Sequence, residues 1–72
     1  MRCILPFISM TAAQRGSRVL ERGNIPHKIV EIDSNMTRRG CAYGVEVACC
    51  FADNAEMILK RQRIRYGDLL QL

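Results

Sequence analysis

One cysteine in this chain has neighbours that favour thiol chemistry. Arg38, Arg39 and Gly40 directly precede Cys41, and an alternating apolar run follows it. Thiols react as thiolates, and adjacent cations lower the thiol pKa. A cysteine with an ordinary pKa of ~8.5 is about 3% thiolate at pH 7, and a pKa one unit lower raises that share to roughly a quarter. We therefore predict that Cys41 is a reactive thiol, that Arg38 and Arg39 stabilise its thiolate, and that Gly40 leaves the sulfur accessible.

The structural alternative for Cys41 stays open. A lone cysteine at the start of a strand is commonly a small buried hydrophobe. The other three cysteines, Cys3, Cys49 and Cys50, are interpreted as structural. Cys49 and Cys50 are adjacent in a predicted strand, so their side chains would point to opposite faces and would chelate a metal poorly.

The sequence lacks the residue patterns of several other chemistries. It has no CxxC spacing, and His27 is its single histidine, so no metal site is expected. His27 is interpreted as a strand-surface residue. Because no histidine–carboxylate pair accompanies a nucleophile and no glycine-rich phosphate loop is present, we expect neither hydrolysis nor cofactor binding. We predict a protein that is not an enzyme and whose only cargo would be sulfur or selenium held covalently on Cys41.

Length and charge limit the number of domains and the partners. The chain has 72 residues, which suffice for one domain, residues 1–72, with a small core. The formal net charge is +4, and the basic residues fall into separate groups rather than one run: Arg15, Arg18 and Arg22; Arg38 and Arg39; Lys60, Arg61, Arg63 and Arg65. Most of these positions fit solvated helix faces. Stacking aromatics and recognised motifs are missing, so nucleic acid is disfavoured as a partner.

The cellular compartment and the state of the cysteines are predicted together. The start of the chain shows no signal-peptide pattern, and no apolar stretch is long enough to span a membrane. We therefore predict a cytoplasmic protein that does not associate with membranes and whose four cysteines stay reduced, as cytosolic thiols do.

Apolar spacing and turn residues predict six alternating elements. They are strand 2–8, helix 11–22, strand 27–32, strand 43–50, helix 53–63 and strand 65–70, with a polar loop over 33–40. This order is typical of the ferredoxin-like βαββαβ fold, an α+β domain in which two helices cover one face of a four-stranded antiparallel sheet. The uncovered sheet face would either be polar or pair with a second copy to form a homodimer.

The order of these parts and the cysteine motif resemble the selenium/sulfur carrier protein-like family. The resemblance runs from Ile4 to about Leu70 and includes Phe7-Ile8-Ser9-Met10-Thr11 at the end of the first strand, Ala12-Ala13, the turn Gly23-Asn24-Ile25, and Cys41 at the start of the third strand. Two features depart from the family pattern. Ala42 replaces a glycine, and Glu31-Ile32-Asp33-Ser34 replaces a Pro-x-Pro-Arg approach.

The resemblance implies a small carrier that holds a persulfide or perselenide on Cys41. Such a carrier receives sulfur or selenium from a donor, for example a cysteine desulfurase, and passes it to an acceptor protein. The alternative is a non-catalytic interaction or regulatory module that dimerises through its open sheet face, with Cys41 structural. Exposure and reactivity of Cys41 distinguish the two.

Overall fold

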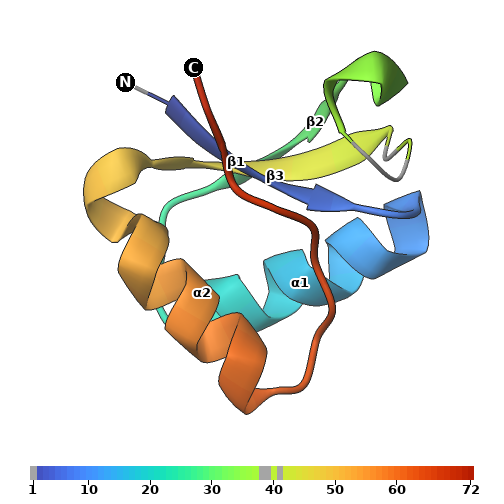
Figure 1. Cartoon of the computed structure of the whole chain (residues 1–72). Helices are drawn as coiled ribbons and strands as arrows, with labels where there is room; N and C mark the ends of the chain where they lie inside the picture. Colours follow the sequence, from blue (N-terminus) through green and yellow to red (C-terminus); the bar gives the residue numbers. More distant parts are fainter. Residues whose placement is uncertain (1, 38–39, 41) are drawn as a thin grey trace.

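A computed structural model describes residues 2–37, 40 and 42–72 of the chain (Figure 1). It is an α+β structure with a four-stranded antiparallel sheet and two α-helices, as predicted. The elements are β1 (Arg2–Phe7), α1 (Met10–Arg22), β2 (Lys28–Glu31), β3 (Tyr43–Ala48), α2 (Ala52–Arg61) and β4 (Leu70–Gln71), with short 3₁₀ turns η1 (Ser34–Met36) and η2 (Cys49–Phe51).

The sheet is built around the pairing of β1 with β3. Its order is β2-β3-β1-β4, and all neighbouring strands are antiparallel. The β1–β3 register runs from Arg2 opposite Ala48 to Phe7 opposite Tyr43. Both central strands therefore have partners on each side, and β2 and β4 form the edges.

One face of the sheet forms the core with both helices, which lie on the same side of the sheet (Figure 1). The sheet contributes Cys3, Leu5, Phe7, Val45 and Val47, and the helices contribute Ala13, Leu20, Ala55 and Leu59. Strand side chains alternate between faces, so these odd-numbered positions of β1 and β3 all point to the helices. The predicted apolar alternation in β3 is confirmed for Tyr43, Val45 and Val47.

Helix α1 packs closely on the sheet because its inner stripe has small side chains. Ala13 and Gly16 are both buried. A Cβ atom at Gly16 would lie 2.7 Å from Cζ of the Phe7 ring, so only glycine fits at that distance. The helix begins after Ser9, whose hydroxyl oxygen accepts from the amide of Ala12 at 3.1 Å. Ser9 is thus the cap, and the helix begins at Met10, one residue before the predicted start at position 11.

Three predicted boundaries in the second half of the chain are also wrong. β3 ends at Ala48, so Cys49 and Cys50 lie in the 3₁₀ turn η2 and not on opposite faces of a strand. α2 begins at Ala52 and ends at Arg61, and its N-terminus has no side-chain cap from the expected Asp53. The last strand comprises only Leu70 and Gln71.

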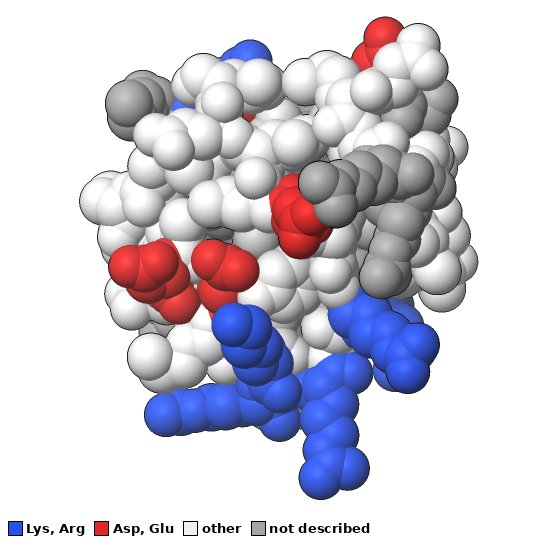
Figure 2. All heavy atoms as spheres, in the orientation of Figure 1, with Lys and Arg blue, Asp and Glu red and all other residues white. Residues whose placement is uncertain are grey.

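The opposite face of the sheet carries apolar residues around one ion-pair cluster. Glu46 is opposite both Ile4 and Lys28, and its carboxylate lies 3.2 Å from Arg2 and 3.6 Å from Lys28. Val30 and Leu70 are half-buried on this face. Figure 2 shows a different surface at the helical end, where Lys and Arg side chains gather below the C-terminal end of α2.

Candidate functional site

The connection between β2 and β3 carries the predicted thiol motif, and hydrogen bonds hold several of its described residues in place. The amide of Ile32 donates to the carbonyl oxygen of Ala42 at 2.9 Å, which continues the strand pairing to the base of the loop. Asp33 organises the first turn, because its carboxylate accepts from the amide of Asn35 at 3.0 Å and its carbonyl oxygen accepts from the amide of Met36 at 2.9 Å.

Gly40 lies in this loop with a backbone conformation that favours glycine. Its φ is +67°, its surface is exposed, and, its chain neighbours aside, no atom of the described residues lies within 4 Å of where a Cβ would stand. Ala42 is also exposed. Of the predicted site residues, Gly40 alone is described; the predictions for Arg38, Arg39 and Cys41 lie outside the described residues.

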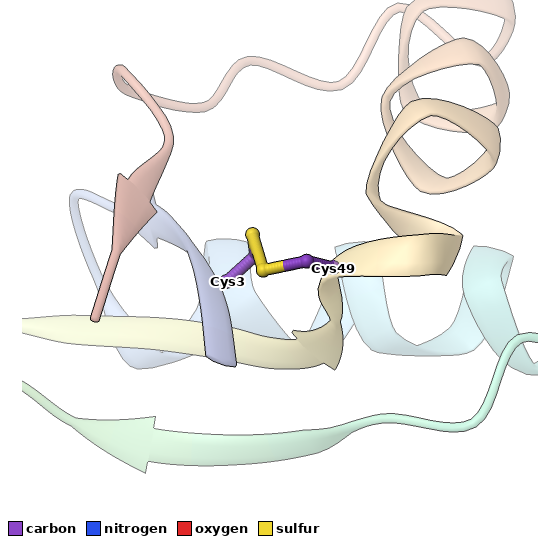
Figure 3. The surroundings of a disulfide bond; sticks show 2 residues. All are labelled: Cys3 and Cys49. Carbon is purple, nitrogen blue, oxygen red and sulfur yellow. A yellow bond between two sulfur atoms is a disulfide. The ribbon is translucent and has the colours of Figure 1, made fainter. Parts of the chain in front are cut away.

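A disulfide joins Cys3 in β1 to Cys49 in η2 (Figure 3). The two Cα atoms are 5.1 Å apart, within the usual range for a disulfide, and Cys3 is buried in the core. The expectation that every cysteine stays reduced is therefore wrong, although the structural role predicted for Cys3 and Cys49 is confirmed. The neighbouring Cys50 is a free, exposed thiol.

His27 has a structural environment, and the interpretation that it is a strand-surface residue is wrong, because it lies before β2 and is half-buried. Its Nδ1 lies 2.7 Å from the carbonyl oxygen of Ile25, and its Nε2 lies 2.6 Å from the hydroxyl of Ser17. A carbonyl oxygen only accepts, so Nδ1 donates, and in the neutral ring Nε2 accepts from Ser17. The ring thereby ties the segment before β2 to α1, and it is not the surface side chain of a strand.

Tyr66 is the titrating group with the clearest perturbation. Its hydroxyl donates to the Glu56 carboxylate at 2.9 Å. Burial, and then the hydrogen bond and the negative charge of Glu56, raise the pKa of Tyr66 to about 12. Each of these causes disfavours the phenolate, so Tyr66 is a neutral tether between α2 and the segment that follows it.

Part of the basic surface has a shape that the sequence did not indicate. Ile8, Ala12, Arg15, Arg63, Ile64, Arg65, Tyr66 and Gly67 line a hollow of about 330 Å³. The three arginines come from α1 and from the segment after α2, so sequence periodicity places them on unrelated solvated faces. No signal in the sequence brings them together.

Two further features concern metals and membranes. Within residues 2–37, 40 and 42–72, no three His, Cys, Asp or Glu side chains are grouped as a metal ion would need. Among the same residues, neither helix has the length and apolar character required to cross a membrane.

Comparisons with known proteins leave the site to be judged on its own chemistry. No family model, curated protein or solved structure matches this chain. Function is therefore argued below from the residues and their surroundings.

Proposed function

We propose that this protein is a carrier that holds sulfur or selenium on Cys41. The observation that carries the proposal is the conformation of Gly40, which is exposed, has a positive φ and has open space where a Cβ would stand. The residue that follows the cysteine, Ala42, is exposed as well. A thiol between two exposed neighbours, preceded by two arginines, fits a sulfur that must meet a partner protein.

The proposal includes the ferredoxin-like form of the α+β fold. The elements occur in the order strand, helix, strand, strand, helix, strand, and the sheet order β2-β3-β1-β4 supports this assignment. In this arrangement the β2–β3 connection lies at the end of the sheet and away from the helical core. The site can therefore contact a donor without disturbance of the fold.

The transfer step needs no added oxidant or reductant. The Cys41 thiolate attacks the outer sulfur of a persulfide on the donor. The sulfur–sulfur bond of the donor breaks, the donor leaves as a thiolate, and Cys41 holds the outer sulfur as a persulfide anion. Arg38 and Arg39 stabilise both anions by their positive charge. The acceptor protein takes the sulfur in the same way, so the carrier is a substrate and not an enzyme.

The proposed partners are a sulfur or selenium donor, such as a cysteine desulfurase, and an acceptor protein. The net charge of +4 favours an acidic docking face on each. A carrier served by a desulfurase would act in the cytoplasm. The Cys3–Cys49 disulfide is more typical of an oxidising compartment, so it has to be stable to cytosolic reductants for this location.

Persulfide transfer to Cys41 can be tested by mass spectrometry. The chain is incubated with a cysteine desulfurase and cysteine, and separately with selenocysteine in place of cysteine, then measured intact and mapped by peptide. We expect one added sulfur or selenium atom on the Cys41 peptide and none in Cys41→Ser. The matched control is Cys50→Ser, which removes a free, exposed thiol outside the proposed site and should load as the parent chain does. An adduct on Cys50 that is lost in Cys50→Ser, or no adduct on Cys41, would contradict the proposal.

A second candidate function rests on the uncovered face of the sheet. This face carries the half-buried Val30, Ile32 and Leu70 and the exposed Leu72. Such a surface favours an interaction module that dimerises sheet to sheet, with Cys41 structural. Sedimentation should then show a dimer that Val30→Lys separates and that Ile8→Lys, at an exposed apolar residue beside α1, leaves intact. A monomer at all concentrations contradicts this candidate.

A further inference from the structure

Two hollows lie along one stripe of α1, and arginines line both. The first contains Arg15, Arg63 and Arg65 and has a volume of about 330 Å³. The second contains Arg22 and Arg61 and has a volume of about 200 Å³. The helix contributes Ala12 and Arg15 to the first hollow, and Val19 and Arg22 to the second.

The spacing of these helix positions makes the two hollows parts of one surface. Residues 12, 15, 19 and 22 recur every three or four positions, so they form a single stripe on α1. Arg15 and Arg22 are seven residues apart, which corresponds to about 10 Å along the helix axis. Arg61, Arg63 and Arg65 border the same stripe from the C-terminal end of α2 and the segment after it. We name the surface of these five arginines the arginine groove.

The charges of the arginine groove are not neutralised within the described part of the chain. All five side chains are exposed, and none forms an ion pair with a carboxylate of residues 2–37, 40 or 42–72. Another hollow contains Glu56 and Asp68 together with Lys60 and Arg65. Arg65 therefore lies at the boundary between the arginine groove and a surface of mixed charge. Figure 2 shows the Lys and Arg side chains gathered at this end of the molecule.

We propose that the arginine groove binds the phosphodiester backbone of a nucleic-acid duplex without reading its bases. The reason is the match between the charge density of the groove and that of a duplex. A duplex presents one negative charge per ~1.7 Å of its axis, which is about six phosphates over the ~10 Å length of the groove. Five guanidinium groups come close to that density, and a guanidinium group has the geometry to form bidentate hydrogen bonds with phosphate oxygens.

The groove favours a duplex over a single strand. Binding of single strands without sequence preference relies on aromatic side chains that stack on bases. The one aromatic residue lining either hollow is Tyr66, and its hydroxyl is held by Glu56. Apolar side chains such as Ile8 and Ile64 also line the groove, and arginine is common in protein interfaces, so competition by an acidic polymer has to separate a protein site from a duplex site. The sequence disfavoured nucleic acid as a partner because stacking aromatics are missing, but contacts to the phosphates of a duplex do not need them.

Salt dependence of duplex binding tests the proposal. Fluorescence anisotropy of a short mixed-sequence DNA duplex, an RNA duplex and the corresponding single strand is measured between about 50 and 200 mM salt. With four or five phosphates contacted, the affinity for the duplexes should fall by about two to three powers of ten over that range. Unlabelled polyglutamate is added as a competitor to detect an acidic-protein site.

Variants that each remove one positive charge show which arginines contact phosphates. Arg15→Gln, Arg61→Gln and Arg65→Gln should each reduce the slope of log K against log salt by about 0.9. These three sites are chosen because Arg63 has a φ of +57° and its replacement could disturb the backbone. Lys28→Gln is the matched control, since it removes one charge from the opposite sheet face.

Each result decides the proposal. Duplex binding that the three arginine variants weaken and Lys28→Gln leaves unchanged supports it, whether DNA or RNA binds more tightly. An equal effect of Lys28→Gln would show that net charge alone is responsible, and would overturn it. No duplex binding at low salt, tighter binding of the single strand, or complete displacement by polyglutamate at matched charge would also overturn it.

Discussion

The Cys3–Cys49 disulfide should provide a large share of the stability of this small domain. The bond joins residues 46 positions apart and connects β1 to the turn that leads into α2. We predict that the double variant Cys3→Ala, Cys49→Ala is markedly less stable than the parent chain. The variant removes both thiols, so neither an unpaired buried thiol nor a new mixed disulfide complicates the comparison.

The magnitude follows from the length of the closed loop. A disulfide restricts the unfolded chain, and for a loop of this length the restriction raises the free energy of the unfolded state by about 4 kcal/mol at 25 °C. The free energy of unfolding increases by the same amount. The expected total for a domain of 72 residues is about 4–11 kcal/mol. Loss of the bond should therefore lower Tm by roughly 16–32 °C, at about 4–8 °C per kcal/mol for a domain of this size.

Urea denaturation followed by circular dichroism measures the effect. The parent chain should lose stability when a reductant is added, and the double variant should not respond to it. Cys50→Ala is the matched control, because this exposed thiol lies beside the bond but outside it, and a surface change typically alters stability by less than about 0.5 kcal/mol. The reasoning is refuted if Cys3 and Cys49 are alkylated in the folded, unreduced protein, or if reductant leaves the stability of the parent chain unchanged.

Two more predictions concern the core and a tyrosine. Gly16→Ala should destabilise the protein by about 1–2 kcal/mol, although alanine favours helices, because its Cβ would lie 2.7 Å from the buried Phe7 ring. Thermal denaturation checks this, and Phe7→Leu in the same background should be less costly than in the parent chain; additive losses would contradict the contact. Tyr66 should ionise near pH 12, so the folded state holds this proton more tightly than the unfolded chain and stability should fall as pH rises from 10 to about 12. Titration of tyrosinate absorbance checks this: Glu56→Gln should lower the pKa, and an unchanged high-pH titration in Tyr66→Phe would contradict the assignment.

Short-range patterns were sufficient to predict most of the elements. The small and apolar residues of α1 recur at helical spacing, and residues 43–47 alternate in polarity, so each segment indicates its own conformation and its buried face. The start of α1 was not fixed by the sequence, because Ser9 and Thr11 both have a side-chain oxygen able to accept from the first turn. Gly40 has a positive φ, a conformation that the glycine itself permits.

Long-range contacts were not predictable in the same way. The short strand β4 is defined by its pairing with β1, where Leu72 and Arg2 exchange backbone hydrogen bonds at opposite ends of the chain. The pairing of Cys3 with Cys49 likewise depends on where η2 packs against β1, because connectivity among four cysteines does not follow from their order.

The sequence by itself determined the α+β class, the packing face of each helix and the candidate thiol motif, since residue spacing and neighbouring charges are local properties. Tertiary structure alone decided the disulfide and the arginine groove. Arg15 and Arg65 line one hollow only because the segment after α2 returns along α1. The packing of the whole core decides which distant parts of a chain lie close together, and local residue patterns do not contain that information.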